Sequence, residues 1–225
     1  MSGMLASVNS LQEALLIEPF AVDVIDLKQP EQGALGALDV RDVRHIVDSL
    51  DADTVVSATI GDLPMHPDQV FAAVQAMAAT GVDYVKIGFF PGGDWPGCIA
   101  KLAEAARHHA LIAVLFADTQ PDLAGIDDLR RAGFTGVMLD TMDKSLGSLT
   151  RLMTQEELMV FVERAKAAGF LTGLAGSLKA TDIDALLPLG ADYLGFRGAL
   201  CRQHCRTAEL DVERIADIRR RLMEV

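Results

Sequence analysis

Two charged residues stand in a stretch of the chain that otherwise reads as an apolar strand. Asp26 and Lys28 lie within residues 24–28 and alternate with Ile25 and Leu27. In a strand, residues two positions apart point to the same side, so the carboxylate and the amine share one face and the apolar pair shares the other. A charge inside a buried strand is costly unless it is paired or used. This stretch is therefore a candidate site.

Lys86 repeats the pattern in residues 83–89, where it alternates with Val85 and Ile87. If the apolar set packs on helices, Lys86 points inward, as Lys28 does. Burial and a neighbouring cation both favour a neutral amine, which can attack a carbonyl and form a Schiff base. A second amine can then move protons. The sequence leaves open which lysine attacks, and whether the charges form only a structural Lys–Asp network.

Strands and helices are expected to alternate along the whole chain. We expect strands at 4–8, 23–28, 54–60, 83–89, 111–117, 136–140, 170–175 and 191–196. Helices are expected at 11–17, 39–50, 67–80, 96–110, 123–132, 154–168, from about 181, and at 211–223. This order predicts an α/β fold, a (β/α)8 TIM barrel forming a single catalytic domain over residues 1–225. The alternative is an open doubly wound sheet, but its Gly-x-Gly-x-x-Gly turn is missing.

The active site of such a barrel lies at the carboxyl ends of its strands. Asp140 ends the sixth strand and Lys144 follows it, which adds a carboxylate and an amine to the lysine pair. Loops after the seventh and eighth strands often bind phosphate with backbone N–H groups. The candidates there are Gly176, Ser177, Arg197 and Gly198. The residues alone thus predict a Schiff-base enzyme acting on a phosphorylated carbonyl compound.

Composition limits the partners. The formal net charge is -12, which argues against nucleic acid as a partner. No apolar run reaches membrane-spanning length and no signal peptide is recognisable, so we expect a cytoplasmic protein without a membrane partner. Cys98, Cys201 and Cys205 form no disulfide framework, and Cys201, His204 and Cys205 match no familiar zinc spacing. Exposed helix faces with Leu and Met allow a homo-oligomer without specifying one.

Several motifs, in order along the chain, resemble the (5-formylfuran-3-yl)methyl phosphate synthases, also called 4-(hydroxymethyl)-2-furancarboxaldehyde-phosphate synthases. The similarity spans nearly the whole chain, and the motifs are specific only when taken together. They are residues 23–28 with Pro30, Gly33 and 35–37, then 56–64, 83–88, 138–141 with Lys144, 174–177 and 195–199.

The resemblance implies a lyase that condenses two molecules of glyceraldehyde 3-phosphate into a furan aldehyde, with loss of phosphate and water. The product would feed the synthesis of methanofuran-type one-carbon carriers. Lys28 resembles the Schiff-base lysine of the family and Lys86 its proton acceptor and donor. Asp26, Asp140 and Lys144 match further active-site positions, and Lys144 is a candidate for a second phosphate. No metal or organic cofactor is implied.

Two other functions remain open from the sequence. One is another class I aldolase of sugar phosphates, which would use the same lysine chemistry without making a furan. The other is a non-catalytic barrel that binds a phosphorylated metabolite. Lys28 and Lys86 argue against a barrel that only binds its ligand, because such a protein does not need two buried amines.

Overall fold

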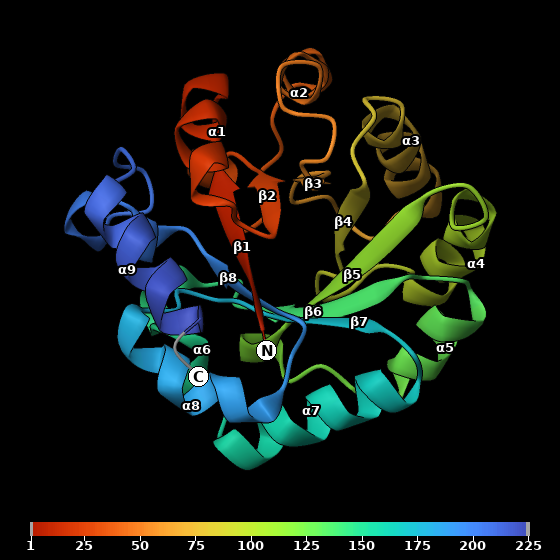
Figure 1. The fold of residues 1–225 in the computed structure, drawn as a ribbon. Coiled ribbons are helices and arrows are strands. Elements are labelled where there is room, and N and C mark those ends of the chain that lie inside the picture. Colours follow the sequence, from red (N-terminus) through yellow and green to blue (C-terminus); the bar gives the residue numbers. More distant parts are fainter. Residues whose placement is uncertain (1, 224–225) are drawn as a thin grey trace.

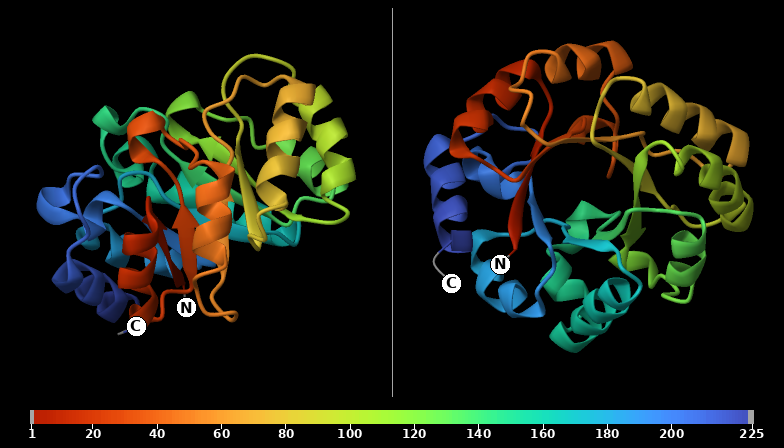
Figure 2. Two further views of the ribbon diagram at one scale, coloured as in Figure 1. Left: turned by 90° about the horizontal axis from the view of Figure 1, so that it is seen from above. Right: turned by 45° about the vertical axis from the view of Figure 1, so that its right-hand side comes forward.

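Eight parallel strands close into one barrel in the order in which they occur along the chain. The computed structural model describes residues 2–223. Helices surround the strands (Figure 1), and Figure 2 shows this ring of helices from two further sides. The predicted (β/α)8 barrel is confirmed, and the open doubly wound sheet is excluded by the pairing of β1 with β8.

The strands agree closely with the predicted ranges. They are β1 (Gly3–Val8), β2 (Val24–Leu27), β3 (Val56–Thr59), β4 (Tyr84–Gly88), β5 (Ala110–Phe116), β6 (Gly136–Asp140), β7 (Leu171–Leu174) and β8 (Tyr193–Phe196). The helices are α1 (Leu11–Ile17), α2 (Val40–Val47), α3 (Pro67–Ala78), α4 (Trp95–Ala105), α5 (Gly125–Arg131), α6 (Leu149–Leu152), α7 (Gln155–Ala167), α8 (Ile183–Leu186) and α9 (Val212–Met223).

Local sequence signals explain several of the helix starts. The side chains of Ser10 and Asp39 accept hydrogen bonds from the first turns of α1 and α2. Thr154 and Glu157 form the predicted capping box at the start of α7. None of the described helices is long and apolar enough to cross a membrane.

Two helical stretches differ from the sequence prediction. The helix expected over residues 96–110 ends at Ala105, because Ala110 pairs with Tyr84 and extends β5 instead. Strand pairing here prevails over the helix propensity of alanine. The short α6 was not predicted at all and lies in what was expected to be a loop after β6.

The alternation of side chains along the strands is the feature that positions the site. Ile25 and Leu27 belong to the core between the barrel and its helices, and so do Val85 and Ile87. Val24 belongs to the separate cluster inside the barrel. Asp26 and Lys86 therefore point inward, as predicted from the two-residue period.

The loop after β2 fills one side of the barrel mouth. Leu35 is fully buried and packs in the interior cluster with Val114 and Phe116, and the rings of Phe90 and Phe116 are 4.6 Å apart. The carboxylate of Asp62 accepts the N–H groups of Ala34 at 2.8 Å and Leu35 at 2.7 Å. This apolar filling leaves the mouth open on the side of β1, β7 and β8.

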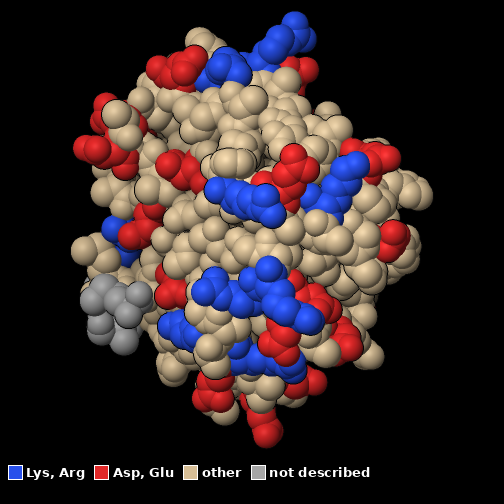
Figure 3. Space-filling model, turned by 90° about the vertical axis from the view of Figure 1, so that its right-hand side faces the viewer, with Lys and Arg blue, Asp and Glu red and all other residues tan. Residues whose placement is uncertain are grey.

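The outer surface carries intermixed charges. On the face drawn in Figure 3, most Lys and Arg side chains adjoin Asp or Glu side chains. The exposed ion pairs of the structure include Lys101–Asp68 and Arg131–Asp128. Pairs of this kind add little stability, so the core and the barrel ladder are the main sources of stability.

Candidate active site

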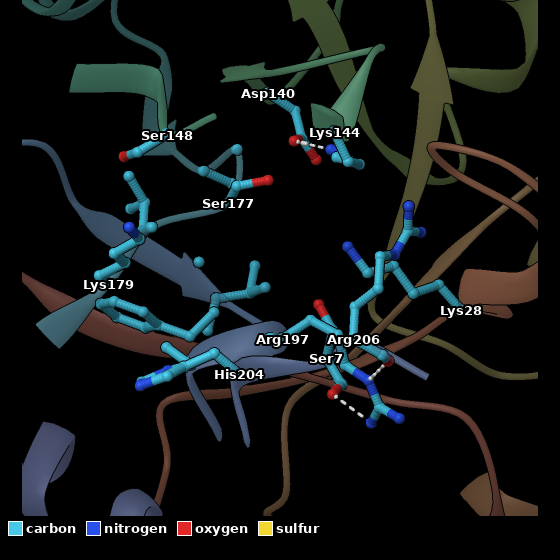
Figure 4. Close-up of a pocket in the computed structure, with 18 of the residues that line it drawn as sticks. Ser7, Lys28, Asp140, Lys144, Ser148, Ser177, Lys179, Arg197, His204 and Arg206 are labelled. Carbon is cyan, nitrogen blue, oxygen red and sulfur yellow. Dashed lines mark hydrogen bonds and ion pairs between the residues drawn. The ribbon is translucent and has the colours of Figure 1, made fainter. Parts of the chain in front are cut away.

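A cavity of about 320 Å³ lies at the carboxyl ends of the strands and has a strongly basic lining. Its charged lining residues are Lys28, Lys86, Asp140, Lys144, Lys179, Arg197 and Arg206. Small residues after β7 and β8, including Gly176 and Gly198, form the opposite wall. The structure thus brings the lysines and the glycine loops predicted from the sequence to one pocket (Figure 4).

Asp26 and Lys86 form a buried ion pair at the floor of the site. The Nζ of Lys86 lies 3.0 Å from Oδ1 of Asp26, and both side chains are almost fully buried. The hydroxyl groups of Ser7 and Ser57 donate to the same carboxylate at 2.9 Å and 2.7 Å. Burial would raise the pKa of Asp26, but Lys86, Lys28 and the Ser57 hydrogen bond hold it below its usual value.

Lys28 differs from the other buried lysines of the site. It follows the last residue of β2, is only 7% exposed, and lines the cavity. Its amine makes no hydrogen bond and no ion pair with any residue of the described range 2–223. Burial lowers the pKa of Lys28 to about 8, although Asp140 and Asp26 nearby oppose the shift. An unpaired amine with a lowered pKa is neutral far more often than an ordinary lysine, and a nucleophile requires the neutral form.

The sequence placed Asp26 and Lys28 on one face of the strand, and in the structure the two interact electrostatically without forming an ion pair. The ion pair of Asp26 is formed with Lys86 on β4 and not with Lys28. The reason is direction along the strand: Lys28 lies one pleat further toward the mouth, while Lys86 reaches Asp26 across β3.

Asp140 and Lys144 form a second pair on the opposite side of the pocket. The Nζ of Lys144 lies 2.5 Å from Oδ1 of Asp140 and also donates to the backbone carbonyl of Thr141. Burial would raise the pKa of Asp140, but Lys144 and Lys28 outweigh it and lower the pKa to about 2. This carboxylate is therefore ionised throughout the physiological range. In Figure 4 a dashed line joins this pair, while Lys28 has none.

Gly176 and Ser177 form a tight turn after β7 with both residues in the left-handed region, at φ 110° and 50°. A Cβ on Gly176 would lie 2.7 Å from a side-chain carbon of Thr141, so only glycine fits there. Gly198 begins a short 3-10 turn, Gly198–Leu200, directly after β8. Both glycines line the pocket and carry no side chain there, so phosphate binding by their backbone stays a prediction.

Arg197 stands in the predicted position, but its guanidinium is occupied. It forms an ion pair with Glu13, donates to the carbonyl of Ser7 at 3.2 Å, and donates through Nε to the carbonyl of Arg206 at 2.8 Å. Figure 4 shows it turned toward Ser7 and Arg206. A phosphate contact from Arg197 would have to compete with Glu13.

Sequence reasoning missed four polar residues of the site. They are Ser7, Ser148, His204 and Arg206. Ser7 occupies an inward position on β1 and could have been found from the two-residue period. The other three come from irregular loops, where no periodicity assigns a direction to a side chain.

The cysteines and histidine after β8 do not converge. Cys201 is buried and donates to the carbonyl of Arg197, whereas Cys205 is exposed. His204 contacts Arg214. Within residues 2–223 no group of three or more His, Cys, Asp or Glu side chains is arranged to hold a metal ion.

Solved structures with the same fold include enzymes with different names. Phosphoribosyl anthranilate isomerase from Thermus thermophilus superposes with a TM-score of 0.70 at 16% identity, covering 99% of this chain and 98% of that one. The 3-hexulose-6-phosphate synthase of Salmonella typhimurium superposes with a TM-score of 0.69 at 16% identity, covering 99% of both chains. At such low identity these likenesses establish the TIM-barrel fold alone.

Sequence relatives are much closer. A protein of Methylorubrum extorquens, provisionally named (5-formylfuran-3-yl)methyl phosphate synthase, is 43% identical and covers 95% of this chain and 88% of its own. The (5-formylfuran-3-yl)methyl phosphate synthase of Methanopyrus kandleri is 33% identical, and the match covers 89% of this chain and 90% of that protein. The sequence model of the 4-HFC-P synthases matches residues 4–219. The chain therefore belongs to the 4-HFC-P synthase family.

Proposed function

We propose that this protein condenses two molecules of glyceraldehyde 3-phosphate into (5-formylfuran-3-yl)methyl phosphate through a Schiff base on Lys28. Phosphate and water are lost, so the reaction class is that of a carbon–oxygen lyase acting on phosphates. The observation that carries the proposal is the unpaired amine of Lys28 between two lysine–aspartate pairs in one basic pocket. The family membership supports the product.

Lys28 is the proposed nucleophile because burial lowers the pKa of its amine and no carboxylate forms an ion pair with it among residues 2–223. With a pKa of about 8, roughly one molecule in ten carries a neutral amine at pH 7. At the ordinary value of 10.5 the share would be about one in three thousand. The lone pair attacks the triose carbonyl carbon, and loss of water gives an iminium.

Lys86 is the proposed proton carrier. Its ion pair with Asp26 holds a proton at the floor of the pocket, next to the position where the carbinolamine hydroxyl forms. After donating that proton, the neutral Lys86 amine can take a proton from the carbon beside the iminium. The resulting enamine carbon then forms a bond to the aldehyde carbon of the second triose. Ser7 and Ser57 fix the Asp26 carboxylate during this exchange.

Asp140 and Lys144 are proposed to balance charge on the other side of the iminium. Asp140 already acts electrostatically on Lys28, and a carboxylate with a pKa of about 2 stays available as a counter-ion. Lys144 can donate to a departing phosphate or hydroxyl. Closure and dehydration to an aromatic furan make the last steps favourable.

The first phosphate is proposed to bind at Gly176, Ser177 and Gly198. All three line the pocket, the two glycines carry no side chain that would keep a phosphate from their backbone, and Ser177 adds a hydroxyl. Arg197 supports this wall from behind through its contacts with Glu13 and Ser7. The proposal places the product in methanofuran-type cofactor synthesis, with a small phosphorylated substrate in the cytoplasm.

The test is incubation with glyceraldehyde 3-phosphate alone, followed by ultraviolet spectroscopy and mass spectrometry. The proposal predicts a furan-aldehyde absorption band and release of inorganic phosphate. An aldol product without the band would favour another class I aldolase. Binding without any turnover would favour the non-catalytic barrel.

A further inference from the structure

Two triose phosphates bring two phosphate groups into one pocket, so a second cationic position is required. Lys86 and Lys144 each form an ion pair with an aspartate, and the guanidinium of Arg197 is occupied by Glu13. Of the other cations in the pocket lining, Lys179 is exposed, whereas Arg206 is half-buried in the loop between β8 and α9.

The guanidinium of Arg206 has unused hydrogen-bonding capacity. Within residues 2–223 its hydrogen bond is from NH2 to the backbone carbonyl of Gly33 at 2.7 Å, and no carboxylate pairs with it. Burial lowers the pKa of Arg206, but an arginine stays charged in a protein. Asp140 and Asp62 act on this charge electrostatically, but neither forms an ion pair with Arg206, so the half-buried guanidinium keeps donors free for an incoming dianion.

The contact with Gly33 connects Arg206 to the segment that carries Lys28. Gly33 lies in the loop after β2, at φ 122°, and a Cβ there would lie 2.1 Å from Oδ2 of Asp62. The adjacent Ala34 and Leu35 are fixed by Asp62 through their N–H groups. The carbonyl that orients the guanidinium therefore belongs to a rigid loop. Figure 4 shows the side chains of Lys28 and Arg206 both extending into the pocket.

We propose that Arg206 binds the phosphate of the second triose phosphate, held in place by the carbonyl of Gly33. The inference rests on the proposed function for the identity of the ligand. The fork of the Arg206 guanidinium suits a phosphate, and its contact with Gly33 holds it against the loop that follows β2 and Lys28, so the bound triose would lie beside the nucleophile. Lys144, which the sequence offered for this role, keeps its contact with Asp140 instead.

The experiment measures binding of glycerol 3-phosphate, which has a phosphate and no carbonyl, by titration calorimetry. Arg206→Gln is expected to weaken binding at one site about 10- to 100-fold, the range for a hydrogen bond to a charged group. Arg202→Gln is the matched control, because Arg202 lies in the same loop but is exposed and pairs with Glu209. It is expected to change binding by less than about threefold.

Three outcomes would overturn the proposal. The first is equal affinity of Arg206→Gln and the unmodified chain, and the second is a loss of affinity in Arg202→Gln as large as that in Arg206→Gln. The third is no binding of glycerol 3-phosphate by the unmodified chain. If Arg206→Gln does not fold, Arg206→Lys replaces it and is expected to bind about 3- to 10-fold more weakly, since it lacks the fork. Unchanged affinity in that variant would also overturn the proposal. A selective loss in Arg206→Gln supports it even if no furan forms, which separates this inference from the proposed function.

Discussion

The Nζ of Lys86 lies 3.0 Å from the carboxylate of Asp26, while the amine of Lys28, two residues after Asp26 in the chain, has no partner among residues 2–223. The two lysines that the sequence could not rank are therefore unequal. Lys86 is held in place by its ion pair with Asp26. Lys28 faces the cavity with a pKa lowered to about 8. This difference determines the roles proposed for them.

The rate of imine formation should rise with pH. A lysine with a lowered pKa is protonated and unreactive below that value, so kcat/KM is expected to increase up to an apparent pKa of about 8 and then level off. The measurement is a pH profile of kcat/KM for glyceraldehyde 3-phosphate. A profile that is flat between about pH 6.5 and 9 would contradict the assignment of Lys28.

Replacing Lys28 by methionine should stabilise the fold while removing activity. Below its folded pKa of about 8, the protonated Lys28 opposes folding relative to an ordinary lysine, and this penalty is relieved as the pH rises toward 10.5. Lys28→Met is expected to raise the free energy of unfolding at pH 7 by about 1 to 3 kcal/mol. Denaturant unfolding checks this, with the exposed Lys179→Met as the control. A clear loss of stability would contradict it.

The Asp26–Lys86 pair should show strong coupling in a double-mutant cycle. Asp26→Asn leaves a buried ammonium without its counter-ion, and Lys86→Met leaves a buried carboxylate, so each single change is expected to cost about 3 to 5 kcal/mol. The double variant should recover much of this loss but remain inactive. Additive single effects in unfolding measurements would show that the contact is not a real pair.

Gly176 should tolerate no side chain. Gly176→Ala forces a Cβ to 2.7 Å from Thr141, whose carbonyl accepts from Lys144, so we expect lost stability of about 2 kcal/mol and reduced kcat. Gly92→Ala is a matched control, because Gly92 also has a positive φ, 79°, but no atom within 4 Å of the added carbon. If both variants lose the same stability and activity, the contact with Thr141 has no role.

Much of this structure could be predicted because the barrel repeats a simple pattern. The two-residue period placed Lys86 inside and Val85 outside, and Thr154 with Glu157 marked a helix start correctly. Strand ends placed Asp140 and Gly176 at the same mouth. These features depend on neighbouring residues in the chain, which is why the sequence alone suffices for them.

The sequence analysis failed to predict contacts between segments that are distant in the chain. Nothing in the sequence around Lys28 shows that Asp26 turns to a lysine on β4, or that Glu13 of α1 occupies Arg197. Arg206 was missed because its direction depends on Gly33, far away in the chain. Such pairings follow from the packing of loops and strand ends, which have no sequence period.

The most direct test of the account is covalent trapping of the imine. The protein is incubated with glyceraldehyde 3-phosphate and borohydride, and the modified peptide is identified by mass spectrometry. The account predicts a reduced adduct on Lys28, absent from Lys28→Arg and still formed, more slowly, in Lys86→Met. An adduct on Lys86, or a Lys28→Arg variant that still makes product, would contradict it.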